Sequence, residues 1–257
     1  MNNTSYIIDL IGKNKRIDGR KLTEYRKPIK IETGISKNAE GSARVLIGET
    51  EVIVGVKLDV GTPFPDTPDE GAIVVTTELL PLSSPVFEAG PPDAQATELA
   101  RIVDRGIRES KMIDLKKLCI KEKEKVWIVY IDIYTINDDG NLIDASALAA
   151  LAALRECRIP KYDEKEGRTK YGEWTDKKVP ITKTPITVTL GKIKDKILVD
   201  LNSKEEEVMD SRLTVAISDG KINAMQKGGD VGIKLDEIDS MIELAIEKAK
   251  ELKTAVK

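Results

Sequence analysis

The sequence contains no histidine among its 257 residues, and this absence excludes more chemistry than any other feature of its composition. A chain without histidine has no Ser-His-Asp triad, no imidazole general base and no imidazole ligand for a metal ion. Carboxylates, lysine, tyrosine and the backbone are the groups that remain for a reaction.

Cysteine is nearly as scarce, since only Cys119 and Cys157 are present and no CxxC spacing occurs. Two such cysteines without accompanying histidines form neither a zinc site nor a disulfide framework. This usage is typical of a reduced intracellular protein, and we expect no metal ion and no cofactor.

The chain has no excess of positive charge, because 41 lysines and arginines stand against 44 aspartates and glutamates. No basic field over the whole molecule attracts nucleic acid, so any contact with RNA must be local.

The sequence also shows no pattern typical of a targeting segment or a membrane-spanning segment. The opening residues 1–16 lack the positive start and long apolar run of a signal peptide. The longest apolar run, residues 147–154, is too short to cross a bilayer. We therefore expect a cytoplasmic protein with no membrane partner.

Alternation of β-branched and polar residues predicts strands over much of the chain. We predict three hairpins, formed by residues 42–47 with 51–60, 186–193 with 196–201, and 213–218 with 221–225. The segment VWIVYIDIYTI, residues 126–136, is apolar on both faces and predicts a central strand.

Helical periodicity predicts an N-terminal helix over residues 6–11 and a final amphipathic helix that begins at Asp236 and covers the second sheet. Residues 145–154 are apolar on all sides and predict a helix buried between layers, with Asp144 as its N-cap. The charged residues 162–178 indicate a surface segment that links two halves.

These elements predict an α/β fold of mixed β-sheets with helices packed on their faces, in two sequential halves. We divide the chain into an N-terminal helical arm over residues 1–24, a first half over residues 25–175 and a second half over residues 176–257.

The stretch GPPDAQATELARIVDRGIRESKM, residues 90–112, predicts an amphipathic helix capped by Asp93. At 100° per residue, Arg101, Arg105 and Arg108 share the face opposite the apolar stripe and can address one polyanion. The alternative is a solvated face, in which acidic residues three or four positions away pair with these arginines. Those acidic residues are Glu98, Asp104 and Glu109.

Several strings in the same order resemble the RNase PH family over nearly the whole chain. They are DGRK (18–21), TELLPL (77–82), FEAGPPD (87–93), ELARIVDRGIRES (98–110) and VDLNSKEEEVMDS (199–211). Within that family the chain is most similar to the non-catalytic ring subunit of the archaeal exosome.

This resemblance implies an RNase PH-like fold and a ring of three heterodimers, in which the chain alternates with a catalytic RNase PH-like subunit. It also implies single-stranded RNA and S1/KH-type RNA-binding cap subunits as partners. The implied complex degrades RNA from its 3′ end by phosphorolysis, and Arg101 and Arg105 are the positions matched to RNA phosphates. Arg108 shares their face but is not one of the matched positions. Arg20 and Arg26 are either RNA contacts or structural hydrogen-bond donors, and we favour the structural role.

The turn before the buried helix bears on catalysis, because a glycine turn at a helix N-terminus is a natural anion site. Active members of the family place a Gly-Ser-Arg loop there to hold inorganic phosphate. This chain has Gly140-Asn141-Leu142 instead. The hydroxyl and the arginine are both missing, so we expect phosphate to find amides without a counter-charge.

The acidic residues 202–210 are a second candidate for chemistry. Glu205, Glu206, Glu207 and Asp210 can gather a divalent ion, or one of them can act as a general acid. Asp210 matches an aspartate that active relatives use near the scissile phosphodiester. The alternative, which we favour, is a solvated acidic turn that no longer meets a substrate.

Three hypotheses follow. In the first, the chain is a non-catalytic ring subunit that structures the neighbour's active site and binds RNA phosphates. In the second, it is a phosphorolytic 3′ to 5′ exoribonuclease in its own right and uses Asp210. In the third, it is a scaffold without RNA contact, and its arginine face binds acidic residues of a partner.

Overall fold

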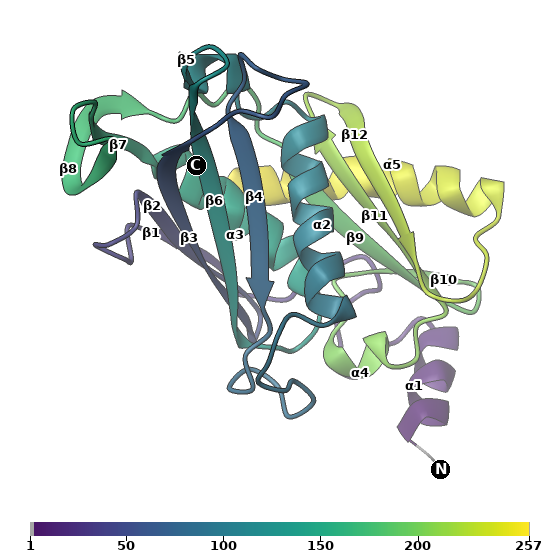
Figure 1. Cartoon of the computed structure of the whole chain (residues 1–257). Coiled ribbons are helices and arrows are strands. Elements are labelled where there is room, and N and C mark those ends of the chain that lie inside the picture. The colour runs from purple at the N-terminus through teal and green to yellow at the C-terminus, as the bar shows by residue number, and fades with distance from the viewer. Residues whose placement is uncertain (1–2, 257) are drawn as a thin grey trace.

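Two large β-sheets and the helices between and around them form the structure, a computed structural model that describes residues 3–256 (Figure 1). The first sheet has the order β1-β2-β3-β6-β4, and β5 pairs with the first residues of β6. Its strands are β1 (Ile29–Thr33), β2 (Gly41–Ile47), β3 (Thr50–Gly61), β4 (Ala72–Glu78), β5 (Cys119–Lys121) and β6 (Lys125–Asn137). All neighbours are antiparallel except β4 and β6.

The second sheet is antiparallel, with the order β10-β9-β11-β12. Its strands are β9 (Ile186–Ile193), β10 (Lys196–Val199), β11 (Ser211–Ser218) and β12 (Lys221–Gly228). Asp219 and Gly220, which join β11 to β12, both have positive φ, at 51° and 73°. Positive φ at both central residues matches the twist of a two-residue hairpin, so the predicted turn is confirmed.

The described residues also form five α-helices and one 3₁₀ turn. They are α1 (Asn3–Gly12), α2 (Ala94–Glu109), η1 (Leu115–Leu118), α3 (Leu142–Glu156), α4 (Ser203–Glu206) and α5 (Leu235–Ala255). No helix within residues 3–256 has both the length and the apolar composition that crossing a membrane requires.

Helix α3 occupies the centre of the molecule, where it contacts β2 and β3 on one side and β9 on the other. Its alanines and leucines are almost all buried, and they join residues of both sheets in one hydrophobic core. Helix α5 lies against β9 and β11, as predicted. A smaller cluster packs α1 through Ile7 and Ile11 against Ile193, Leu198 and Val208.

The predicted hairpins and the central strand are confirmed, with three corrections. Strand β6 lies inside the first sheet, but only one of its faces is buried, because a sheet covered by helices on one side leaves alternate residues half-exposed. Helix α3 begins at Leu142 with Asn141 at the N-cap position, so Asp144 lies in its first turn and is not its cap. The expected surface segment is an antiparallel pair, β7 (Arg158–Asp163) and β8 (Arg168–Lys178).

The first sheet uses residues 29–137 and the second uses residues 186–228, so the sheets follow one another along the chain. The division between residues 175 and 176 stays a prediction, and it falls within β8.

Candidate nucleic-acid interface

Helix α2 lies between β4, an edge strand of the first sheet, and β12, an edge strand of the second (Figure 1). Asp93 begins it, because its Oδ1 accepts a hydrogen bond of 2.7 Å from the backbone N–H of Ala96. Gly106 lies over Thr187 of β9 and Ala216 of β11. The predicted apolar stripe therefore packs onto the body, and the opposite face remains open.

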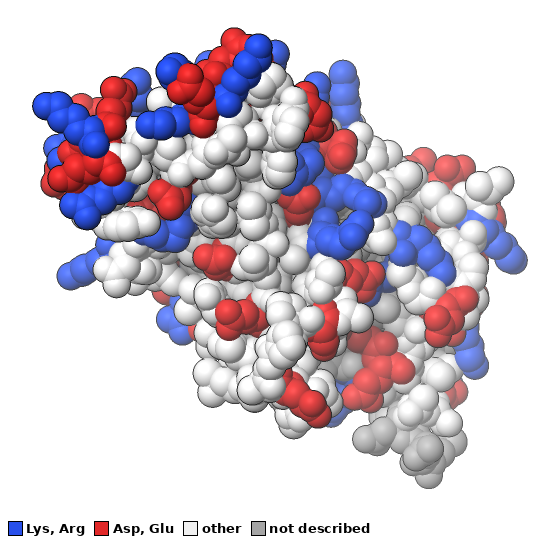
Figure 2. All heavy atoms as spheres, in the orientation of Figure 1, with Lys and Arg blue, Asp and Glu red and all other residues white. Residues whose placement is uncertain are grey.

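Arg101, Arg105 and Arg108 are all exposed on this open face, and lysine and arginine atoms gather over α2 in Figure 2. Their surroundings differ. Arg108 pairs with Asp104 at 2.6 Å and donates to the carbonyl oxygen of Ile73 at 3.1 Å. Among the described residues, the side chain of Arg105 donates only to Oε1 of Gln226, at 2.9 Å. Within residues 3–256, Arg101 forms no ion pair and no hydrogen bond through its side chain.

A groove of about 350 Å³ separates α2 from β12, and its lining includes Arg101, Arg105 and Gln226. Arg108 lies on the other side of the helix, toward β4. The helical spacing predicted one cluster of three arginines. The structure instead places Arg101 between two grooves, since it lines the first with Arg105 and the second with Arg108.

The predicted intrahelical ion pairs form at one position only. Asp104 pairs with Arg108, whereas Glu98 pairs with Arg212 of β11 at 2.6 Å. Glu109 has no ion pair with any residue of the described chain, 3–256. The solvated-face interpretation therefore describes Arg108, while Arg101 and Arg105 keep charges that no internal carboxylate neutralises.

The glycine turn follows β6 and lies against the segment that leads into α4. Gly140 has a φ of 81°, and a Cβ there would lie 2.6 Å from the backbone of Leu201 and Asn202. Only glycine fits this turn, on grounds of both φ and space. Asn141 follows with a φ of 55° and precedes α3.

Carboxylates of the chain itself satisfy the amides of this turn. Oε1 of Glu206 accepts a hydrogen bond of 2.8 Å from the N–H of Asn141. Oδ1 of Asp138 accepts one of 2.9 Å from the N–H of Gly140. An external anion would have to displace Glu206 and would meet several negative charges nearby.

A positive charge also lies beside the turn, and the sequence did not predict it. Arg26 donates to the carbonyl oxygen of Gly140 at 3.0 Å and pairs with Asp139 at 2.9 Å and with Asp200 at 2.9 Å. The expectation of amides without a counter-charge was therefore wrong. Arg26 supplies this positive charge, but it is buried and already paired with the carboxylates of Asp139 and Asp200.

Asp200 anchors this network between the halves. Besides its contacts with Arg26, the Asp200 carboxylate pairs with Arg20 at 3.0 Å and accepts a hydrogen bond of 2.8 Å from Nδ2 of Asn141. Burial alone would raise the pKa of Asp200, but the hydrogen bonds and charge of Arg26 outweigh it and leave the pKa below its ordinary value. Arg20 and Arg26 thus have the structural role that we favoured from the sequence.

Desolvation by the surrounding protein, with a smaller contribution from Asp138, raises the pKa of Glu206 to about 7. Part of the Glu206 side chain is exposed, so solvent screens some of this effect. Its hydrogen bond to Asn141 opposes the rise, because it favours the ionised carboxylate.

Asp144, in the first turn of α3, is buried at 1% exposure. Its Oδ2 accepts hydrogen bonds from the Tyr25 hydroxyl at 2.9 Å and from Nδ2 of Asn141 at 3.2 Å. Its Oδ1 has no hydrogen-bond partner within residues 3–256. Burial is the main cause that raises the pKa of Asp144 to about 7.

We predict that Asp144→Asn changes how stability depends on pH. The pKa of an unfolded aspartate is about 4, so the folded chain keeps a proton that the unfolded chain loses between about pH 4 and pH 7. In the wild type, the contribution of Asp144 to the free energy of unfolding is fully present below pH 4. It declines as the pH rises to 7, by up to about 1.4 kcal/mol per pH unit. Asparagine keeps the acceptor for Tyr25 without titrating. Urea unfolding across this range should show that the free energy of unfolding of the variant rises relative to that of the wild type up to pH 7. A difference between the two that stays constant with pH would contradict the raised pKa of Asp144.

The acidic segment does not gather its carboxylates at one point. Glu205 is buried against Arg16, and Glu206 binds the turn. Asp210 accepts a hydrogen bond of 2.5 Å from the N–H of Lys194. Across residues 3–256 no group of three such ligands is placed to hold a metal ion. A role for Asp210 in catalysis stays a prediction.

The chain is similar to known proteins over nearly its whole length. Residues 25–160 match domain 1 of the 3′ exoribonuclease family, RNase PH, and residues 183–248 match its domain 2. The exosome complex component Rrp42 of Thermococcus gammatolerans is 49% identical over 251 residues, which cover 96% of this chain and 91% of the relative. Rrp42 of Methanothermobacter thermautotrophicus is 45% identical over 247 residues, with the same coverage.

A solved structure is also similar. A chain of the Archaeoglobus fulgidus exosome with RNA bound to the active site superposes with a TM-score of 0.91 at 44% identity, over 99% of this chain and 98% of that chain. The predicted RNase PH-like fold is thereby confirmed. The chain belongs to the RNase PH family, and within it to the group of the archaeal Rrp42 exosome components.

Proposed function

We propose that the chain is a non-catalytic subunit of an exosome ring, in which it alternates with an active RNase PH-like subunit in three heterodimers. In this ring it structures the neighbour's active site and binds RNA phosphates during 3′ to 5′ phosphorolysis. The similarity to Rrp42 components and to an exosome structure with RNA supports this assignment.

The observation that carries the proposal is the contrast between two sites. On α2, Arg101 and Arg105 line an open groove, and within residues 3–256 neither forms an ion pair, because Glu98 in the same lining pairs with Arg212. At the N-terminus of α3, where an anion would bind, the amides of Gly140 and Asn141 already bind Asp138 and Glu206. Arg101 and Arg105 are therefore available to bind a nucleic-acid backbone, whereas the amides before α3 are already occupied and do not bind phosphate.

Phosphorolysis requires inorganic phosphate to be held in line with the terminal phosphodiester, because positioning and charge stabilisation supply most of the rate. The attacking phosphate oxygen bonds to the phosphorus of the terminal phosphodiester while the bond from that phosphorus to the 3′ oxygen of the preceding nucleotide breaks. That oxygen takes up a proton and becomes the 3′ hydroxyl of the shortened RNA, and the terminal nucleotide is released as a nucleoside diphosphate. The turn at Gly140 meets a phosphate with carboxylates and with an arginine that is already paired. We assign the attack to the Gly-Ser-Arg loop of the partner.

Arg101 and Arg105 suit the complementary task. A guanidinium binds two phosphate oxygens at once, and contacts to phosphates position a strand without reading its sequence. The other partners that we propose are single-stranded RNA and S1/KH-type cap subunits, in the cytoplasm.

We predict that the purified chain alone releases no nucleoside diphosphate from RNA in the presence of inorganic phosphate and magnesium. Adding an RNase PH-like partner with an intact Gly-Ser-Arg loop should produce it. Thin-layer chromatography of end-labelled RNA products measures both reactions. Phosphate-dependent release of nucleoside diphosphate by the lone chain would favour an independent exoribonuclease instead.

A further inference from the structure

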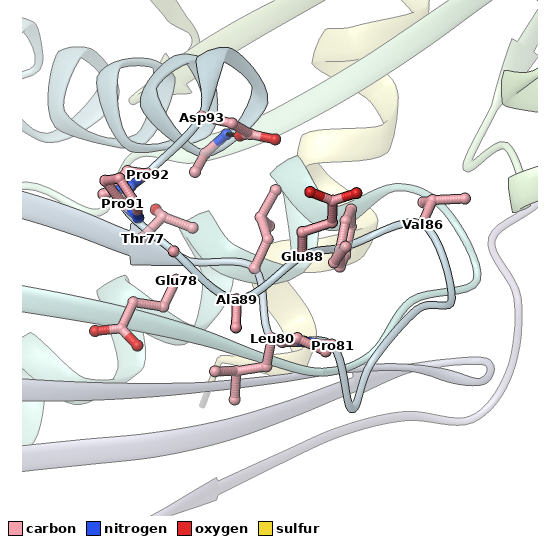
Figure 3. A pocket seen from close by; sticks show the side chains of 14 residues that line it. Thr77, Glu78, Leu80, Pro81, Val86, Glu88, Ala89, Pro91, Pro92 and Asp93 are labelled. Carbon is pink, nitrogen blue, oxygen red and sulfur yellow. Dashed lines mark hydrogen bonds between the residues drawn. The ribbon is translucent and has the colours of Figure 1, made fainter.

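A pocket of about 410 Å³ lies where the end of β4, the loop after it and the start of α2 meet. Residues of two sequence strings that the arginine face does not account for line this pocket: 77–81 of TELLPL and 87–93, the whole of FEAGPPD. Figure 3 shows their side chains around it, with Thr77 and Glu78 from β4, Glu88 from the loop and Asp93 at the start of α2.

All charged side chains in the lining are acidic. Glu78 and Glu88 are exposed, and neither carboxylate has an ion pair or a hydrogen bond with another residue of the described chain. Asp93 is partly engaged by the N–H of Ala96. A phosphate backbone would be repelled here, so the pocket does not suit RNA.

Most of the other side chains in the lining are apolar, and the loop exposes further apolar side chains. Leu80, Pro81 and Phe87 line the pocket, and Leu82 and Val86 in the same loop are 77% and 75% exposed. Large apolar side chains this exposed, beside carboxylates without partners, indicate a protein interface rather than a solvated loop.

Thr77 provides an independent sign of a missing partner. The residue is 2% exposed, and its Oγ1 has no hydrogen-bond partner within residues 3–256. A buried hydroxyl without a partner destabilises the lone chain. Because Thr77 lines the pocket, a group that enters the pocket can supply this hydrogen bond.

The pocket also continues into the arginine face. Thr77, Pro92 and Ala96 line both the pocket and the adjoining groove that reaches Arg101 and Arg108. A protein segment seated in the pocket would lie beside the arginines and form a second wall for a strand bound to them.

We infer that this pocket docks a segment of the neighbouring ring subunit that carries a lysine or arginine next to an apolar side chain. The inference rests on the proposed ring assembly. The basic group pairs with Glu78 and Glu88, the apolar side chain covers Leu80 and Phe87, and a polar group of the segment satisfies Thr77. The acidic end of this face thus binds protein, and its cationic middle stays free for RNA.

The test measures assembly of the full chain with the RNase PH-like partner by isothermal titration calorimetry. Glu78→Gln/Glu88→Gln should weaken assembly at least about tenfold and flatten its salt dependence. The matched control, Glu243→Gln/Glu247→Gln on the exposed side of α5, should leave assembly unchanged. Thr77→Val should keep or raise the unfolding temperature of the lone chain and still weaken assembly, which a purely structural role for Thr77 would not do.

Wild-type affinity in both the Glu78/Glu88 and the Thr77 variants would overturn the inference and leave the ring proposal intact. Tighter binding of single-stranded RNA by Glu78→Gln/Glu88→Gln, without a change in assembly, would overturn it too, since the carboxylates would then face RNA. Failure of the wild-type chain to assemble with the partner would overturn the ring proposal and this inference together.

Discussion

In a ring assembled with the RNase PH-like partner, Arg101→Ala/Arg105→Ala should weaken the binding of single-stranded RNA by about ten- to a hundredfold. Each charge-assisted hydrogen bond to a phosphate contributes about 1.5–3 kcal/mol, and exposure in the groove reduces that value. The loss should be similar for every RNA sequence, because phosphates carry no sequence information. Fluorescence anisotropy over a range of salt concentrations should show a slope that is flatter by about 1.4, which corresponds to two phosphate contacts on a single strand.

Arg108→Ala is the control for this experiment, since it removes the same side chain from the same helix. Asp104 already neutralises Arg108 at 2.6 Å, so its loss should change RNA affinity and the salt slope far less. Equal losses from Arg108 and from the Arg101/Arg105 pair would mean that general helix charge, rather than the groove beside β12, attracts RNA. No loss from the double variant would favour a scaffold without RNA contact.

Arg26→Met should destabilise the isolated chain by about 3–5 kcal/mol, the largest loss of stability that we predict for one substitution. Arg26 is buried and bonds to Asp139, Gly140 and Asp200, so methionine leaves the fully buried carboxylate of Asp200 without its main partner. Urea unfolding followed by circular dichroism measures the change.

Arg44→Met provides the comparison, because Arg44 also pairs with a carboxylate, Glu51, but lies 46% exposed on the surface. Exposed pairs contribute about 0–1 kcal/mol, and this variant should stay within that range. If Arg26→Met costs no more than Arg44→Met, the network around Asp200 does not hold the turn at Gly140 in place.

Local patterns in the sequence predicted those elements whose residues interact with near neighbours. The hairpin at Asp219-Gly220 depends on two residues with positive φ, and both were readable as a turn. Helix α2 was predictable with its cap and its buried stripe, because Asp93 and the apolar spacing lie within a few residues of each other. The pair β7–β8 escaped prediction because its charged residues mask strand alternation.

The chemistry at Gly140 was only half predictable. The missing serine and arginine could be read from the sequence, and they indicated a weak phosphate site. The residues that fill the site come from far along the chain: Glu206 is 65 positions from Asn141, and Arg26 is 174 positions from Asp200. Such contacts depend on the packing of the second half against the first, which local periodicity does not report.

The acidic segment shows the same limit. Its carboxylates looked equivalent in sequence, yet Glu205 is buried with Arg16, Glu206 binds the turn and Asp210 binds the backbone of Lys194. Neighbours in sequence point to different partners because α4 is a single helical turn between two strands. Of these carboxylates, Glu206 joins Asp138 in binding the amides of the turn at Gly140.

A ring in which only the partner's phosphate loop is disabled tests most directly the claim that this chain binds RNA but does not cut it. We would assemble the wild-type chain with a partner whose Gly-Ser-Arg arginine is replaced by alanine, and measure RNA affinity and nucleoside diphosphate release on the same sample. The account predicts that most of the RNA affinity remains, that it still depends on Arg101 and Arg105, and that no nucleoside diphosphate forms. Phosphate-dependent release of nucleoside diphosphate from that ring would contradict it.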